Sequence, residues 1–341
     1  MELKDFHQLI DSSLKKMDLG FYFDALPNLE KILKLSHFKK LKIQDQLFIR
    51  KRVSWIQLSI GHYEIGWENF TYNWLKNFHK FEKIKKQNNK IKYLIDFSQI
   101  KNGEKVLIWN DGGYGDFIYQ LRLMKYFNKS TRVKIFDNKM SHLLKNKNFI
   151  AKNAHDFSWH LPLNELPRII NYNPTRHNNF DYNYLIEPEK NEMDFSDYVG
   201  LTYKTSTSDK KSIEYKLFEK LFVKKKNIKF LILQKPLNKY EKNFFSNFSN
   251  VNIVDNYDNN FLFQDTFNIV NSLKFLISID TAITHIAGYH GKKNFLLLPH
   301  PSSFYWGYKE KRSVDYKNHL IFRQRSSADW QPVIDDLISK I

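Results

Sequence analysis

A carboxylate in a glycine-rich turn is the first feature of the sequence that could do chemistry. Gly113 and Gly115 follow a short apolar run at 105–109 and precede a helix-like segment. Glycines permit a tight turn and a close approach of the backbone to a ligand. Asp116, presented in this turn, suits a general base better than a binding site for an anion. The structural alternative is that Asp116 caps a helix beginning at Phe117.

The same turn has a second, weaker interpretation as a dinucleotide-binding fingerprint. Gly113 and Gly115 would be its first two glycines, and Asp137 ends the next predicted strand, where a ribose-binding acid would lie. Ile118 stands where the third glycine should be, and the carboxylate of Asp116 stands where a pyrophosphate would have to lie. A nicotinamide-dependent oxidoreductase is therefore kept as an alternative.

The second candidate is the junction between a strand and a helix near residue 280. Asp280 ends the apolar run 275–279. The backbone N–H groups that begin the predicted helix are those of Thr281, Ala282 and Ile283. Such groups at a helix N-terminus bind anions, which predicts a site for a diphosphate. Asp280 could bind sugar hydroxyls there, or it could only cap the helix.

Nearby side chains could assist at this site without a metal. His285 lies one turn into the helix and could donate to an oxyanion, and Lys210 and Lys211 could neutralise a phosphate. Lysines in a loop are more often solvated surface. His285 and His290 are five residues apart, which is wrong for two metal ligands on one helical face, and no Asp-x-Asp pair occurs. No metal is therefore expected.

Short apolar runs that alternate with helix-sized segments must position these residues. The predicted strands are 105–109, 133–136, 197–203, 228–233, 251–254, 275–279 and 294–298, and helices are predicted near 213–225, 239–247, 265–273 and 282–290. This alternation predicts an α/β chain with two successive doubly wound parallel sheets. The polar segment 187–197 is the expected boundary, and a ligand cleft is expected between the carboxyl ends of the two sheets.

The region before about residue 95 is predicted to be helical. Two similar segments begin near Gly20 and Gly61, and each has a small residue, Ala25 or Gly66, five positions later. A small residue at that place lets two antiparallel helices approach closely. The pattern favours two degenerate tetratricopeptide-like hairpins, with a plain helical bundle as the alternative. We expect this region to serve acceptor docking, a protein partner or stability rather than chemistry.

Composition excludes several classes of function. The 341 residues include no cysteine, which removes thiolate catalysis, disulfides and cysteine-ligated metals. Mean hydropathy is −0.55, and no apolar run approaches the roughly 20 residues of a membrane span. The net charge of +18 comes mainly from lysines spread along the chain, so a solvated surface is favoured over a specific nucleic-acid site. The N-terminus has no apolar signal core, so we expect a cytoplasmic protein, with peripheral membrane association allowed.

Four stretches of the sequence together carry a resemblance to a known family. The matching residues are Trp109, Gly113, Gly115, Asp116, Ile118 and Arg122; His160, Pro162, Leu163, Leu166 and Pro167; Asp280, Thr281, Ala282, His285, Gly288 and Gly291; and Phe322, Arg323, Gln324, Asp329, Trp330 and Val333. In order and spacing they resemble the bacterial tetratricopeptide-containing glycosyltransferases of GT-B fold, relatives of the ADP-heptose:lipopolysaccharide heptosyltransferases.

The resemblance implies a GT-B enzyme with two Rossmann-like domains facing across a cleft. The helical region would span 1–95, the acceptor-side domain 96–195 and the nucleotide-sugar-binding domain 196–341. It implies an inverting transfer of a hexosyl or heptosyl group from a nucleotide-sugar to a hydroxyl of a glycan, lipid-linked, lipopolysaccharide or protein acceptor, without metal or other cofactor.

The resemblance also assigns roles to residues. Asp116 would deprotonate the acceptor, and the nucleoside diphosphate would leave onto the helix N-terminus at 281–283. The donor-side candidates are Asp280, Thr281, Ala282, Ile283, His285, Lys211 and Gln234, and the acceptor-side candidates are Gly113, Gly115, Arg122 and His160. A non-catalytic binding module, in which the helical region holds a partner and the cleft is vestigial, is the remaining alternative.

Overall fold

The computed structural model describes residues 2–70, 77–127, 132–136, 139–177, 184–189, 194–206, 208–254 and 263–341. The chain divides into two compact units. The first unit contains Met1–Leu185 and Ser303–Tyr308, and the second contains Ile186–Ser302 and Lys309–Ile341. The six residues Ser303–Tyr308 therefore belong to the first unit, although the segments on both sides of them belong to the second.

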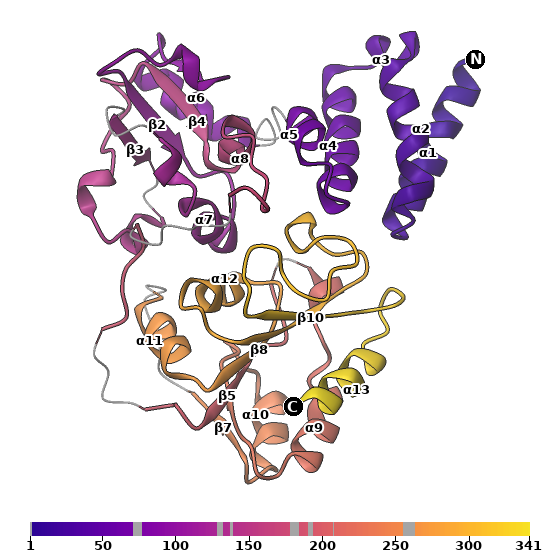
Figure 1. The fold of residues 1–341 in the computed structure, drawn as a ribbon, viewed down its shortest axis with the longest axis vertical. Helices are drawn as coiled ribbons and strands as arrows, with labels where there is room; N and C mark the ends of the chain where they lie inside the picture. Colours follow the sequence, from indigo (N-terminus) through magenta and orange to yellow (C-terminus); the bar gives the residue numbers. More distant parts are fainter. Residues whose placement is uncertain are drawn as a thin grey trace. The chain divides into compact units, whose positions relative to one another are not determined.

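Helices precede the first sheet (Figure 1): α1 (Leu3–Asp18), α2 (Tyr22–Lys34), α3 (Ser36–Lys40), α4 (Ile43–Ser59), α5 (Tyr63–Phe70) and α6 (Phe78–Gln87). Helix α1 packs against α2, and α4 packs against α5. Ala25 is fully buried in α2. A Cβ atom at Gly66 would lie 2.8 Å from Leu58 Cδ2, so the close approach of α4 and α5 requires glycine there. The tetratricopeptide-like character of these hairpins stays a prediction.

The first unit contains a four-stranded sheet in the order β1-β4-β2-β3, and every pairing is parallel. Its strands are β1 (Lys92–Tyr93), β2 (Lys105–Trp109), β3 (Arg132–Phe136) and β4 (Trp159–Pro162), with helices α7 (Tyr114–Leu121) and α8 (Leu166–Ile169). Strand β2 is buried over four of its five residues, as expected for a central parallel strand.

The second unit contains a six-stranded sheet in the order β10-β9-β8-β5-β6-β7, again parallel throughout (Figure 1). The strands are β5 (Tyr198–Leu201), β6 (Lys229–Ile232), β7 (Val251–Ile253), β8 (Phe275–Ile279), β9 (Asn294–Leu298) and β10 (His319–Arg323). The helices are α9 (Glu219–Lys224), α10 (Lys239–Ser246), α11 (Gln264–Ser272), α12 (Ala282–Tyr289) and α13 (Gln331–Lys340). Strands β8 and β9 are buried at every position.

The predicted α/β class with parallel sheets is confirmed, and each predicted strand and helix of the sheet regions has a counterpart. Strands β1, β4 and β10 were not predicted as strands. Within the described ranges, none of the helices combines the length and apolar character that a membrane crossing demands.

Candidate functional site

Each sheet has a position where successive connections change direction. In the first unit, β3 lies on one side of β2 and β4 on the other, so the switch point is between β2 and β4. In the second unit, β6 and β7 lie on one side of β5 and β8 on the other, so the switch point is between β5 and β8. Open parallel sheets bind ligands at the carboxyl ends of strands at such switch points. The turn that contains Asp116 and the junction at Asp280 follow β2 and β8, and so lie at these points.

The switch point of the first unit is bridged by a buried aspartate. Asp111 follows β2 and is 3 % exposed, and its Oδ1 accepts a hydrogen bond of 3.0 Å from the backbone N–H of Asn164, which follows β4. The side chain of Asn110 folds back on the same turn, with its Oδ1 accepting from the N–H of Gly112 at 3.0 Å. The turn is thereby fixed by side-chain-to-backbone bonds.

Asp116 lies in the first turn of α7 and is half-buried. Helix α7 begins at Tyr114, three residues before the predicted start at Phe117. The backbone N–H of Gly113 donates to Asp116 Oδ2 at 2.9 Å, so the expected structural role of this carboxylate is present. A Cβ at Gly112 would lie 2.5 Å from Asp116 Cβ, so only glycine fits beside it. The other oxygen, Oδ1, accepts from the hydroxyl of Tyr305 at 3.2 Å.

Two acceptor-side candidates are built into the interior of the first unit. Arg122 is 1 % exposed, its Nε donates to Tyr119 O at 2.8 Å, and its guanidinium lies 3.9 Å from the centre of the Tyr119 ring. His160 is also 1 % exposed and accepts from Trp109 Nε1 through Nδ1 at 3.2 Å. Burial, with a smaller contribution from the charge of Lys85, lowers the pKa of His160 to about 3, so it is neutral at physiological pH. Gly113 is exposed and Gly115 half-buried in the turn itself.

The switch point of the second unit is bridged by an ion pair. Lys211, in the loop after β5, donates through Nζ to Asp280 Oδ2 at 2.5 Å. Asp280 is 9 % exposed, whereas Lys211 remains half-buried. The N-cap of α12 is Thr281, whose side chain makes no capping hydrogen bond. The prediction that Asp280 could be the cap therefore gives way to a carboxylate paired with a lysine.

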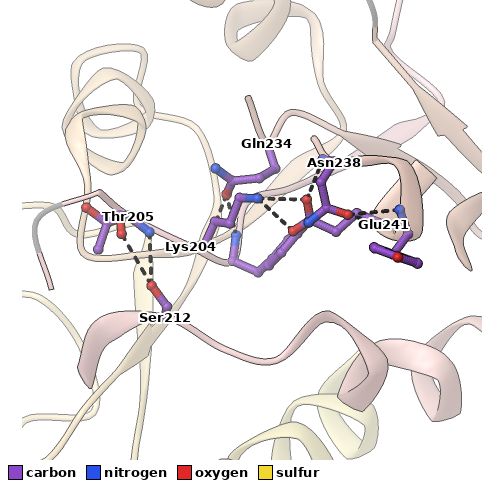
Figure 2. A network of polar contacts seen from close by, with 8 residues as sticks. Lys204, Thr205, Ser212, Gln234, Asn238 and Glu241 are labelled. Carbon is purple, nitrogen blue, oxygen red and sulfur yellow. Dashed lines mark hydrogen bonds and ion pairs between the residues drawn. The ribbon is translucent and has the colours of Figure 1, made fainter. Parts of the chain in front are cut away.

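The loop after β5 is held by a network of polar contacts (Figure 2). Both oxygens of Glu241 accept from Lys204 Nζ, at 2.7 and 2.8 Å, and Oε1 also accepts from the Tyr203 hydroxyl at 2.9 Å. Gln234 Oε1 accepts from the backbone N–H groups of Tyr203 and Lys204 at 3.2 and 2.9 Å. Gln234, predicted at the donor site, thus holds the start of the loop after β5, in which Lys211 lies further along.

His285 is buried in α12 and is 4 % exposed. Its Nδ1 lies 3.0 Å from the hydroxyl of Tyr316. The ring of Tyr316 also packs against Gly288, where a Cβ would lie 2.4 Å from the ring atom Cδ1. Ala282 is half-buried, like Thr281, and Ile283 is buried. The proposed oxyanion role of His285 stays a prediction.

Within the described ranges, no group of three or more His, Asp or Glu side chains is arranged to hold a metal ion. For the oxidoreductase alternative, Ile118 is buried in α7 in place of the third glycine. Asp137, its expected ribose-binding acid, lies outside the described residues.

The sequence analysis missed Tyr305, Tyr316 and the Lys204–Glu241 pair. Tyr305 and Tyr316 stand outside any periodic segment, in a loop between β9 and β10. The aromatic run Phe304–Trp306 could have indicated the contacts of Tyr305, because three adjacent aromatic side chains in a polar loop are expected to pack against other residues.

No family model matches the sequence, and no curated protein matches it. Among solved structures, the chain is similar to E. coli heptosyltransferase WaaC with ADP-2-deoxy-2-fluoro heptose, at 11 % identity and a TM-score of 0.41, over 69 % of this chain and 99 % of that chain. It is also similar to the glycosyl transferase family 9 protein from Veillonella parvula DSM 2008, at 11 % identity and a TM-score of 0.39, over 67 % and 87 %. A third similar structure is the dodecameric iron-containing heptosyltransferase TibC in complex with ADP-D-beta-D-heptose, at 9 % identity and a TM-score of 0.36, over 58 % and 59 %.

Proposed function

We propose that this protein is a metal-independent, inverting glycosyltransferase that moves a sugar from a nucleotide-sugar to a hydroxyl acceptor. One observation carries the proposal: the switch points of the two sheets offer complementary chemistry. A half-buried carboxylate, Asp116, lies at the first switch point, and a lysine paired with Asp280 lies beside the N-terminus of α12 at the second. The resemblance of both motifs to the heptosyltransferase-related glycosyltransferases supports the same conclusion.

The donor belongs to the second unit in this proposal. The N-terminus of α12 carries partial positive charge, and its first-turn N–H groups suit the oxygens of a diphosphate. Lys211 offsets the negative charge of Asp280 and can donate to an oxygen of the diphosphate, while the Asp280 carboxylate can accept hydrogen bonds from sugar hydroxyls. Gln234 contributes indirectly, because it fixes the loop that carries Lys211.

In this proposal, the acceptor binds with its hydroxyl next to Asp116. Asp116 takes the proton from the hydroxyl as its oxygen attacks the anomeric carbon of the donor sugar. The bond between that carbon and the phosphate oxygen breaks, and the pair of electrons leaves with the nucleoside diphosphate. Lys211 and the α12 N-terminus stabilise the negative charge that develops on it. Attack from the face opposite the leaving group inverts the anomeric configuration.

Nucleotide binding and turnover test the proposal in two steps. A thermal-shift screen with ADP, UDP, GDP and their sugars should identify the base, because a ligand present at 100 times its Kd stabilises the folded protein by about 2.7 kcal/mol. Release of nucleoside diphosphate from the sugar that binds should then be measured with water and with glycan, lipid-linked and protein acceptors. If none of the nucleotides binds and none of the sugars is consumed, the proposal is wrong.

A further inference from the structure

We infer that Tyr305 is a positioning residue for Asp116, holding the carboxylate in the orientation in which it takes the acceptor proton. The inference rests on the proposed function and deepens it. Tyr305 comes from the segment Ser303–Tyr308, which belongs to the first unit although its flanking segments belong to the second. The sequence places this hydroxyl 189 positions away from the carboxylate that it contacts.

The contacts account for both oxygens of the carboxylate. Gly113 N–H donates to Oδ2 at 2.9 Å and the Tyr305 hydroxyl donates to Oδ1 at 3.2 Å. A carboxylate oxygen has two lone pairs, so each oxygen retains one for an acceptor hydroxyl. Two donors on different oxygens fix the plane of the carboxylate, which a single bond from Gly113 would leave free to rotate. A base held in this way loses less entropy when it engages the substrate.

Aromatic packing fixes the place of the Tyr305 ring. Its centroid lies 4.4 Å from that of Tyr119 in α7 and 4.2 Å from that of Phe304. Phe304 in turn contacts three aromatic rings of α4 and α5, at centroid distances of 5.1, 5.8 and 5.9 Å: Trp55, Trp67 and Phe70. The helical region therefore acts on the candidate base through this segment, without supplying a reacting group.

The Tyr305 hydroxyl stays a donor over the working pH range. Burial, followed by the negative charge of Asp116, raises the pKa of Tyr305 well above its ordinary value. A protonated phenol donates to a carboxylate, whereas a phenolate would repel it. The second tyrosine of the segment, Tyr308, instead donates to Gly20 O at 2.8 Å and stacks on Tyr22 at a centroid distance of 4.9 Å.

This arrangement provides a matched pair of variants. Tyr305→Phe and Tyr308→Phe each remove one hydroxyl from the same segment and keep the ring, but only the first removes a bond to Asp116. Nucleoside diphosphate release should be measured with ADP-heptose, UDP-glucose, UDP-N-acetylglucosamine and GDP-mannose, using water as the acceptor. We expect Tyr305→Phe to lower kcat about 10- to 100-fold, the factor corresponding to one hydrogen bond to a charged group. The donor KM should stay within about twofold, because the donor is held by the second unit.

Two further measurements separate positioning from a structural role. In the Asp116→Asn background, adding Tyr305→Phe should lower the residual kcat no further, because its effect passes through Asp116. Tyr308→Phe should keep the wild-type kcat, and the unfolding temperatures of both variants should be compared with the wild type to confirm folding.

The outcomes are distinguishable from those of the proposed function. If Asp116→Asn lowers kcat but Tyr305→Phe leaves it unchanged, the inference is overturned while the proposed function stands. The same holds if Tyr305→Phe and Tyr308→Phe lose equal activity, or if Tyr305→Phe lowers activity equally with and without Asp116. If the wild type turns over none of the donors with water or with the glycan, lipid-linked and protein acceptors, the proposed function falls and the inference falls with it.

Discussion

After β2 in one unit and after β8 in the other, a short turn leads from the carboxyl end of a parallel strand into a helix of eight residues, α7 or α12. The two helices differ in their first turns. Helix α7 has Asp116 there, whereas the first turn of α12 has no acidic residue, and its N-cap Thr281 makes no side-chain capping bond. The two units therefore share the arrangement of strand, turn and helix, but the first turns of α7 and α12 differ in charge.

The difference explains how one architecture can serve two partners in a reaction. A carboxylate in the first turn neutralises the positive end of the helix dipole, so α7 has little attraction left for a second anion. The N-terminus of α12 keeps that attraction, because Lys211 offsets the charge of the neighbouring Asp280. In the proposed reaction, the base that takes up the proton is therefore placed at α7. The leaving nucleoside diphosphate, which gains negative charge, is placed at α12.

The largest effect should come from removing the charge at α7. Asp116→Asn should lower turnover about 10²- to 10⁴-fold, because the amide cannot take the acceptor proton. Binding of the nucleoside diphosphate should stay near wild type, since the proposed donor site is at the other switch point. Turnover is measured by nucleoside diphosphate release, and binding by thermal shift or calorimetry.

The amide is also the control for the structural role of Asp116. Asparagine caps helices about as well as aspartate, so its oxygen can still accept from Gly113 N–H and stability should change little. Near-normal turnover of Asp116→Asn on the acceptor would reduce Asp116 to a cap and remove the contrast between the two helices.

The next effect should come from the cation at the other switch point. Lys211→Met should weaken binding of the nucleoside diphosphate about 10- to 100-fold, because it removes a charge-assisted bond and leaves the Asp280 carboxylate without its lysine. The matched control is Lys210→Met, which removes the adjacent, exposed lysine of the same loop. Isothermal calorimetry measures both. Equal losses in the two variants would show a general attraction of the basic loop rather than a site at Lys211.

Strands, helices and turns that depend on a regular pattern of neighbouring residues could mostly be predicted from the sequence. The alternation of apolar runs with helix-sized segments located seven of the strands. The glycine-rich turn before Asp116 and the strand-to-helix junction at Asp280 located the two switch points. The sequence also predicted that Asp116 could have a capping role, and the bond from Gly113 N–H is present. These features are local, since each depends on residues within one turn or one strand.

Contacts between distant segments could not be predicted in the same way. Tyr305 meets Asp116, and Lys204 meets Glu241, only because the topology brings separate loops together. The ion pair of Lys211 with Asp280 likewise follows from the neighbouring positions of β5 and β8, which no periodicity reveals. Strand β4 was not predicted because it lies in a proline-rich motif, and proline is uncommon in strands.

A buried histidine in each unit should make stability sensitive to acid. The pKa of His160 is lowered to about 3, and burial lowers that of His319 to about 4. The unfolded state keeps the ordinary pKa of about 6.5, so it takes up the protons first as the pH falls. Each histidine contributes stability that is complete above about pH 6.5 and is lost as the pH falls toward its folded pKa.

The loss from pH 6 to pH 5 should be about 1 kcal/mol for each histidine in the free energy of unfolding. Urea unfolding at the two pH values measures it, followed by separate probes for the two units. His160→Gln, which keeps an acceptor for Trp109 Nε1, should reduce this loss in the first unit. His319→Gln should reduce it in the second unit, where His290, whose pKa burial also lowers to about 4, keeps its own share. A pH dependence that neither variant reduces would show that other groups control acid unfolding.

The smallest effect should come from removing metal ions. A divalent ion that holds a diphosphate needs carboxylate ligands free to bind it. At the second switch point, Asp280 is already engaged by Lys211 at 2.5 Å, and both oxygens of Glu241 are engaged by Lys204. At either carboxylate, a divalent ion would compete with the positive charge of the lysine already bound there. EDTA should therefore change the Kd of the nucleoside diphosphate, and the turnover, by less than about twofold, well under the 1.4 kcal/mol of a tenfold change. Loss of binding in EDTA that Mg²⁺ or Mn²⁺ restores would show that Lys211 and α12 do not hold the diphosphate alone.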